Sequence, residues 1–233
     1  MNTVFFKNLG LIDFEKAWKV QEGLMNSIID TKRAGKKTKN YLLFCQHPHV
    51  YTLGKSGDSN NLLLSNKQMT DVGVDFYKTN RGGDITYHGP GQLVVYPIFD
   101  LDNFFTDIHK YLRYLEDVVI NVLETYGVVG VRLKKITGVW IKDRGRENYY
   151  KKICAMGVRA SRWVTMHGLA FNINVDLKYF NNIIPCGLSD MGVTSLSSEL
   201  EKKLNQMEVE ERMKCAFEET FGVKIVNDEE VEV

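Results

Sequence analysis

The fold class is decided by four short apolar runs: "VGVRL" (129–133), "GVWIK" (138–142), "KICAMGVR" (152–159) and "HGLAFNINVDL" (167–177). Turn residues separate these runs, and "DRGREN" (143–148) has the composition of a hairpin turn. Apolar runs of this length between turn residues are typical of β-strands. Because the runs follow one another without a helical pattern between them, they predict an antiparallel or mixed sheet.

Three helices are predicted outside this stretch. In "DFEKAWKVQEGLMNSIID" (13–30), apolar residues recur at helical spacing behind Asp13, a residue that can cap a helix N-terminus. A second apolar stripe runs over 108–126 and ends at Gly127, a residue type common at helix C-termini. A third, closing helix is expected over 209–221.

Further strands are predicted before and between the helices. They cover 41–46, 49–54, 74–80 and 92–99, and shorter apolar runs occur at 4–6 and 223–226. His47-Pro48 should break the first two apart, because proline cannot donate to a sheet ladder. Strands in runs with irregularly placed helices predict an α+β fold, a mixed or antiparallel β-sheet with packed helices. Since the chain shows no linker and no repeat, we expect residues 1–233 to form a single domain.

The composition is that of a soluble globular protein, with 44% hydrophobic and 25% charged residues. No apolar run approaches the roughly 20 residues of a membrane helix, and the start "MNTVFFKNLGLIDFEKAW" lacks the features of a targeting peptide. A formal net charge of +1 excludes a strong overall attraction to nucleic acid. We therefore expect a cytoplasmic protein without membrane or nucleic-acid partners. Two basic stretches, 32–39 and 134–152, are either solvated loops or local docking sites.

The stretch "RGGDITYHGPGQLVVYP" (81–97) has several glycines around one histidine and then continues into an apolar strand. It matches neither the P-loop nor the GxGxxG pattern, so the sequence does not favour a phosphate site. Glycine allows a backbone to approach a ligand closely or to adopt positive φ. The stretch therefore indicates one wall of a site for an elongated apolar ligand with a polar end. A tight turn between two strands is the alternative.

A candidate nucleophile lies in "IIPCGLSDMGVTSL" (183–196), where Cys186 stands between a proline and a glycine, in a loop or bend. The other three thiols, Cys45, Cys154 and Cys215, lie within periodic elements, where a free cysteine usually behaves as a small buried hydrophobe. With four scattered cysteines the chain has neither a disulfide framework nor a CxxC metal site. Cys186 is therefore the first choice for covalent chemistry.

A cysteine nucleophile at neutral pH needs a neighbouring base or cation. His88, His167 or a lysine could serve. Lys152 enters the apolar run "ICAMGV", so a strand would turn its side chain inward and that of Lys151 outward. The alternative for any single lysine is a solvated position at a strand end.

A metal site is the weaker interpretation of His47 and His49. The two lie on one face of a possible strand, but Pro48 interrupts it and no third ligand is near in the sequence. We expect a structural role for this pair and no metal.

Taken together, four blocks resemble those of the octanoyl-[acyl-carrier-protein]:protein octanoyltransferases, also called lipoyl(octanoyl) transferases. The blocks are "RGGDITYHGPGQLVVYP", "KICAMGVR", "HGLAFNIN" and "IIPCGL…GVTSL", in this order and at these separations over about 41–196. The resemblance implies the fold of the lipoate and biotin protein ligases. It also implies that an octanoyl group passes from acyl carrier protein to an enzyme cysteine, and then to a lysine of a lipoyl domain, as the first step of endogenous protein lipoylation.

The resemblance also implies residue roles. Cys186 is the nucleophile, and Lys152 is the residue that activates the thiol and moves protons. The implied acyl-binding residues are Arg81, Gly82, Gly83, Asp84, Ile85, Thr86, Tyr87, His88, Ala155, Met156, Gly157, His167, Gly168, Leu169 and Ala170. In this interpretation His88 and His167 shape the pocket and are not the base. Asp84 departs from the family pattern, which more often has an amide or a basic residue there.

The implied donor is octanoyl-acyl carrier protein, and the implied acceptors are the lipoyl domains of 2-oxoacid dehydrogenase complexes and the glycine cleavage H protein. No cofactor is needed, because transfer between thioesters is nearly isoenergetic and the final amide is more stable. We expect a monomer. Three alternatives remain: an ATP-dependent lipoate or biotin ligase, a cysteine thioesterase, and a non-catalytic relative that holds the acylated domain.

Overall fold

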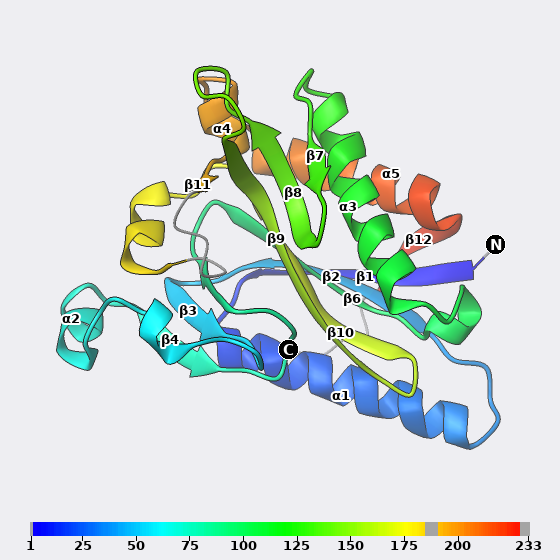
Figure 1. The fold of residues 1–233 in the computed structure, drawn as a ribbon. Helices are drawn as coiled ribbons and strands as arrows, with labels where there is room; N and C mark the ends of the chain where they lie inside the picture. The colour runs from blue at the N-terminus through cyan, green and yellow to red at the C-terminus, as the bar shows by residue number, and fades with distance from the viewer. Residues whose placement is uncertain (1, 185–190, 229–233) are drawn as a thin grey trace.

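The structure, a computed structural model, describes residues 2–184 and 191–228. Within these residues a nine-stranded mixed sheet forms the centre of the fold (Figure 1). Its main path runs β12 (Val223–Asn227), β1 (Asn2–Leu11), β2 (Asn40–Gln46), β6 (Gln92–Ile98), β10 (Val164–Asn172), β9 (Tyr150–Ser161), β8 (Ile136–Lys142) and β7 (Val131–Leu133). The short β11 (Gly192–Val193) pairs with β9.

The large sheet is parallel at one end and antiparallel through its middle. β1 pairs in parallel with both β12 and β2, whereas the pairs from β2 through β6, β10, β9 and β8 to β7 are antiparallel. A second sheet has the order β4 (Asp75–Lys78), β3 (Val50–Leu53), β5 (Ile85–His88). His47 and Pro48 carry the chain from the large sheet to this small one, so the predicted break between the two strands is confirmed.

Helices cover both faces of the large sheet (Figure 1). α1 (Phe14–Arg33) packs on one face, where Ala17, Met25 and Ile28 join a buried cluster with β2, β6 and β10. α3 (Ile108–Glu124) and α5 (Gln206–Phe221) pack on the other face around a larger apolar cluster. The short helices are α2 (Asn66–Asp71), α4 (Leu196–Glu199), η1 (Ser59–Asn61), η2 (Leu101–Asn103) and η3 (Leu177–Asn182). The predicted mixed sheet packed by helices is therefore confirmed.

The predicted start of α1 and the predicted turn 143–148 are both confirmed. The carboxylate of Asp13 accepts from the backbone N–H groups of Glu15 and Lys16, at 2.9 and 3.2 Å, and so caps α1. The turn 143–148 joins the antiparallel strands β8 and β9, as predicted.

Two expectations need correction. The apolar run 4–6 is only the middle of a ten-residue strand, β1, which the parallel partners β2 and β12 stabilise from either side. Cys215 is exposed, whereas Cys45 and Cys154 are buried as expected. The buried residues of α5 include Val209, Met213 and Phe217, and Cys215 lies outside this stripe.

Candidate functional site

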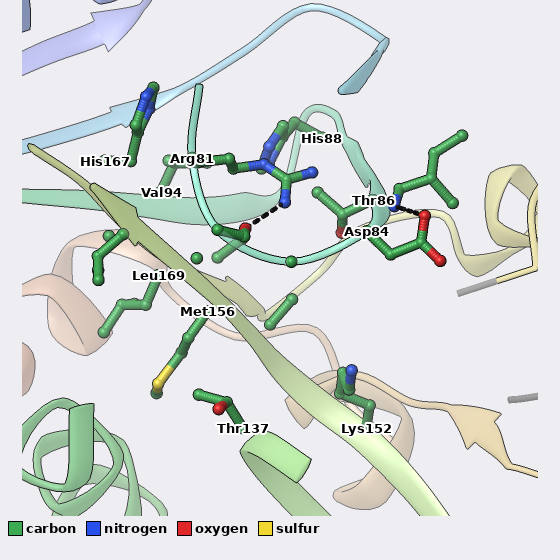
Figure 2. A pocket seen from close by; sticks show the side chains of 18 of the residues that line it. Arg81, Asp84, Thr86, His88, Val94, Thr137, Lys152, Met156, His167 and Leu169 are labelled. Carbon is green, nitrogen blue, oxygen red and sulfur yellow. Dashed lines mark hydrogen bonds between the residues drawn. The ribbon is translucent and has the colours of Figure 1, made fainter. Parts of the chain in front are cut away.

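A cavity of about 520 Å³ lies where the loop before β5 faces β6, β9 and β10 (Figure 2). This volume falls within the range of about 300–1,000 Å³ typical of small-molecule sites. α1 and α3 contribute Phe14, Ile108 and Leu112 to its wall. The residues predicted from the sequence that line it are Arg81, Gly82, Gly83, Asp84, Ile85, Thr86, His88, Lys152, Ala155, Met156, Gly157, His167, Gly168, Leu169 and Ala170.

Tyr87 is not among the lining residues. Its phenol oxygen is hydrogen-bonded to Nδ1 of His49 at 2.7 Å, and its ring stacks on that of Tyr179 with centroids 5.1 Å apart. Alternate residues of a strand point to opposite faces, so Thr86 and His88 face the cavity while Tyr87 packs behind it. The contribution of Tyr87 is to support β5 from the far side.

Arg81 holds the loop before β5 against the small sheet. Its Nη2 donates to the backbone oxygen of Thr52 at 2.6 Å, and its Nε and Nη2 reach the Thr52 hydroxyl at 3.3 and 3.0 Å. Its Nη1 donates to the oxygen of Gly82 at 3.0 Å. The guanidinium is therefore fixed at the wall of the cavity, with the side chain only 8% exposed.

The glycines around the cavity allow segments of backbone to approach one another. A Cβ on Gly157 would lie 2.5 Å from the oxygen of Gly82, and a Cβ on Gly168 would lie 2.1 Å from the oxygen of Val95. Gly82 also donates its N–H to the oxygen of Val158 at 2.9 Å. The loop is thus pinned against β9. The absence of side chains at Gly157 and Gly168 therefore follows from packing between strands and loop. That the glycines of 81–97 let the backbone approach a ligand stays a prediction.

His88 belongs to a directed chain of hydrogen bonds. Its Nδ1 donates to Oε1 of Gln92 at 2.8 Å, and its Nε2 faces the Thr52 hydroxyl at 3.4 Å. Gln92 Nε2 donates to Oδ1 of Asn172 at 2.9 Å, and Asn172 Nδ2 donates to the oxygen of Thr194 at 2.9 Å. The Thr194 N–H in turn donates to the oxygen of Lys152 at 3.0 Å. The chain therefore connects β5 to the strand that carries the predicted lysine.

Both cavity histidines are poor bases. Burial, together with repulsion from the nearby His47 and Arg81, lowers the pKa of His88 to about 3. Burial also lowers the pKa of His167 to about 3, with added repulsion from Arg81 and Arg159. At neutral pH both are uncharged imidazoles. His167 Nε2 is hydrogen-bonded to Oδ1 of Asn80 at 2.8 Å, which fits a role in shaping the pocket.

Lys152 points toward the cavity and lies next to a bulge in β9. Trp140 of β8 pairs with Lys152, but the next β8 residue, Val139, pairs with Cys154, so β9 contains one additional residue at this point. The Lys152 side chain is 7% exposed and its Nζ lies 4.6 Å from the centre of the Trp140 ring. Its aliphatic stem runs past Gly138, where a Cβ would be 3.6 Å from Lys152 Cε.

Lys151 points the other way, as predicted. Its Nζ lies 2.7 Å from a carboxylate oxygen of Glu199 and 3.5 Å from one of Asp143. Only Lys152 of the pair lines the cavity.

Comparison with known proteins gives the family. The model of the lipoyl protein ligase A/B catalytic domain matches residues 13–218. An octanoyltransferase of Christiangramia forsetii is 54% identical over 94% of this chain and 96% of its own length. An octanoyltransferase of Flavobacterium psychrophilum is 52% identical over 96% of this chain and 99% of its own length.

The chain belongs to the octanoyltransferase family.

Solved structures agree with this family at the level of the fold. A bi-partite lipoate protein ligase from Thermoplasma acidophilum superposes with a TM-score of 0.72 at 17% identity, covering 97% of this chain and 86% of its own. A biotin protein ligase from Aquifex aeolicus gives 0.54 at 14% identity, covering 95% and 71%. The fold of this octanoyltransferase family member is therefore that of the lipoate and biotin protein ligases.

Cys186 lies outside the described residues, so its predicted place beside Lys152 stays a prediction. Both neighbouring segments are anchored at described positions. Ile184 donates its N–H to the oxygen of Asn61 at 2.9 Å, and Val193 pairs with Lys152 across β11 and β9. Val193 also lines the cavity.

Asp84 anchors the loop before β5. Its carboxylate accepts from the backbone N–H groups of Ile85 at 2.7 Å and Asp58 at 3.1 Å, and from Nδ2 of Asn61 at 2.6 Å. The acid therefore ties η1 to the start of β5.

Sequence reasoning missed several residues of the octanoyltransferase cavity. Some stand inside the four sequence blocks but were not assigned to the site: Gln92, Val94, Tyr96, Val158, Asn172 and Val193. The others come from segments outside the blocks: Phe14, Ile108, Leu112, Lys135, Ile136, Thr137 and Phe180.

The pair His47 and His49 has structural contacts. His47 is fully buried, with Nδ1 2.7 Å from the oxygen of Ile12 and Nε2 2.7 Å from the phenol oxygen of Tyr96. Across residues 2–184 and 191–228, no three His, Cys, Asp or Glu side chains gather as metal ligands. Over the same residues no helix has the length and apolar character to cross a membrane.

Proposed function

We propose that this chain transfers an octanoyl group from octanoyl-acyl carrier protein, through a thioester on Cys186, to a lysine of a lipoyl domain. Residues 1–233 act as one catalytic domain. The acceptors are the lipoyl domains of 2-oxoacid dehydrogenase complexes and the glycine cleavage H protein. The observation that carries this proposal is the placement of Lys152 at the wall of the cavity, paired with the strand that follows the Cys186 segment.

The first half-reaction is an exchange of thioesters. Lys152 takes the proton of the Cys186 thiol, and the thiolate attacks the octanoyl carbonyl, so that a new C–S bond to Cys186 forms. The C–S bond to the carrier then breaks, and Lys152 returns the proton to the departing carrier thiol. The octanoyl chain lies in the cavity, beside Met156 and Leu169.

The second half-reaction forms the amide. The amine of the acceptor lysine attacks the carbonyl of the Cys186 thioester, a C–N bond forms and the C–S bond to Cys186 breaks. The amine loses one proton, which reaches the Cys186 sulfur through Lys152. Since His88 and His167 have pKa values near 3, they cannot take up this proton at neutral pH.

Intact mass spectrometry after mixing with octanoyl-acyl carrier protein tests the proposal. We expect an octanoyl adduct on the wild-type chain, no octanoyl thioester adduct on Cys186→Ser, and slow acylation of Lys152→Ala. Lys151→Ala is the matched control, because its side chain is the adjacent lysine on β9 but pairs with Glu199 away from the cavity. Acylation of Lys152→Ala at the wild-type rate would remove Lys152 from the mechanism.

Product analysis with a lipoyl domain separates the alternatives. We expect octanoylated domain without ATP. Strict dependence on ATP would indicate a ligase, and free octanoate as the main product would indicate a thioesterase. Unchanged transfer by Cys186→Ser would contradict the thioester route.

A further inference from the structure

We propose that a second cavity, beside the acyl cavity, binds the phosphopantetheine arm that links octanoate to its carrier; this rests on the proposed function. The second cavity has a volume of about 550 Å³. Tyr149 from the end of the β8–β9 turn, residues of η3, and Gly192 of β11 line it.

The two cavities share a wall. Phe180 and Val193 line both. Val193 pairs directly with Lys152, the residue that moves the protons in the proposed transfer. Lys152 lines the acyl cavity, and its strand partner Val193 lines both cavities, so the second cavity lies next to the strand pair that carries Lys152. A fatty acid would end at its carboxyl group, whereas an acyl thioester continues into an arm that needs its own space.

The lining of the second cavity matches the chemistry of that arm. Pantetheine contains two amides, a hydroxyl group and a pair of methyl groups. Leu177 and Ile183 offer apolar contacts, and Asn181 and the phenol of Tyr149 offer hydrogen bonds. The phenol oxygen lies over Gly192, where an added Cβ would be 2.9 Å from it, so the bare β11 backbone leaves room for Tyr149.

Positive charge at the rim favours the donor arm as the occupant. Lys178 lines the cavity and is exposed. The exposed Arg146 guanidinium lies 5.0 Å from the centre of the Tyr149 ring. The acid on the same element, Asp176, caps η3 by accepting the Lys178 N–H at 3.0 Å. Two cations suit the phosphodiester of the arm and disfavour the cationic lysine of the acceptor.

Three thioesters of increasing length test this inference. Octanoyl-N-acetylcysteamine lacks most of the arm, octanoyl-pantetheine lacks only the phosphate, and octanoyl-4′-phosphopantetheine has both. The measurement is the second-order rate constant for acylation of Cys186, followed by intact mass spectrometry. Octanoyl-coenzyme A and octanoyl-acyl carrier protein are tested as two further donors. Their rate constants show which source of phosphopantetheine the cavity accepts.

Different variants test the positive charge beside the second cavity and the free volume inside it. For Lys178→Ala and Arg146→Ala we expect the ratio of the phosphopantetheine to the pantetheine rate constant to fall about three- to tenfold, as for one exposed phosphate contact. Asn181→Trp should fill the cavity and lower the ratio of the pantetheine to the N-acetylcysteamine rate constant about tenfold. Lys224→Ala, an exposed lysine on the far edge strand β12, should leave both ratios unchanged.

The outcomes separate this inference from the proposed function. If the wild-type chain is acylated by all three thioesters but no variant changes either ratio, the arm does not bind in the second cavity and the proposed function stands. If no thioester, octanoyl-acyl carrier protein included, acylates the wild-type chain, both fail. If a variant lowered the acylation rate constant equally for all three thioesters, the inference would also be overturned, because this would show a general effect on the site.

Discussion

The Nζ of Lys152 lies 4.6 Å from the centre of the Trp140 ring, and the two residues pair across β8 and β9. A cation over an aromatic face is attracted to it by about 0.5–2 kcal/mol. Trp140 is also almost fully buried, so it cannot move away from the lysine. The ring therefore holds the Nζ end of the side chain at the edge of the cavity, and it would stabilise the ammonium that forms when Lys152 takes the thiol proton.

Replacing this ring should slow acylation. We expect Trp140→Leu to lower the single-turnover rate about three- to thirtyfold, the equivalent of the lost cation–π attraction, and Trp140→Phe to lose less. A double-mutant cycle with Lys152→Ala checks the cause. If Trp140 acts through Lys152, Trp140→Leu has little further effect in the Lys152→Ala background. Additive losses would contradict this positioning role.

A second prediction concerns Glu116 of α3. Its Oε1 accepts the N–H of Gly138 at 3.0 Å, next to the stem of Lys152, and its Oε2 binds Arg113 at 2.6 Å and Arg132 at 3.0 Å. Glu116→Ala leaves the Gly138 N–H without this acceptor. We expect a loss of about 1–3 kcal/mol in the free energy of unfolding and slower acylation.

Conservative variants test the cause of that loss. Glu116→Gln keeps an acceptor for Gly138, so it should restore most of the acylation rate even though the ion pairs are weakened. Asp117→Asn is the matched control, because Asp117 is the partly exposed neighbour that also contacts Arg132. Equal acylation rates for Glu116→Ala and Glu116→Gln would show that the Gly138 contact is irrelevant to Lys152.

Leu169 should help to set the length of acyl chain that the cavity accepts. Its side chain lines the cavity and is 2% exposed (Figure 2). Leu169→Phe adds volume to the wall, so we expect the preference among hexanoyl, octanoyl and decanoyl thioesters to shift about tenfold toward the shorter chains. Leu169→Met conserves volume and should keep the wild-type order. A uniform loss for all chain lengths would argue against the assignment.

Stability should fall as the pH drops below about 6.5. Burial lowers the pKa of His47 to about 4, from 6.5, and the pKa values of His88 and His167 to about 3. The unfolded chain therefore binds protons first, and each histidine removes roughly 1–2 kcal/mol of stability at pH 5 relative to pH 7. The loss proceeds from about pH 6.5 down to about pH 4 for His47 and to about pH 3 for His88 and His167. Chemical denaturation at a series of pH values measures it.

Substitution of one histidine checks the source of this pH dependence. His47→Gln should reduce the slope of the unfolding free energy against pH between pH 4 and 6.5, whatever its effect at neutral pH. His109 is exposed at the start of α3, so His109→Gln should leave the slope as it is. An unchanged slope in His47→Gln would mean that His47 does not contribute.

Local sequence patterns correctly predicted the features that depend on a single segment of the chain. The α1 stripe behind Asp13 and the opposite directions of Lys151 and Lys152 follow from side-chain periodicity alone. The same rule could have excluded Tyr87 from the cavity, since it alternates with Thr86 and His88, and could have placed Cys215 outside the buried stripe of α5.

Contacts between distant segments could not be predicted in this way. The length of β1 depends on β12, more than two hundred residues later in the chain. Thr137 and Ile108 reach the cavity because β8 and α3 pack beside β9. The bulge at Ile153 arises from the register between two strands, which the sequence of either strand alone does not reveal.

The parallel pairing of β1 with β12 has a consequence for synthesis. Asn2 to Phe6 pair with Val223 to Asn227, so this edge of β1 cannot be completed until almost the whole chain has left the ribosome. At about 5–20 residues per second, the wait is roughly 10–45 s. Throughout this interval a row of backbone hydrogen-bonding groups stands open to other strands. The nascent chain therefore passes through a period in which a chaperone, or a second nascent chain, competes for the place of β12.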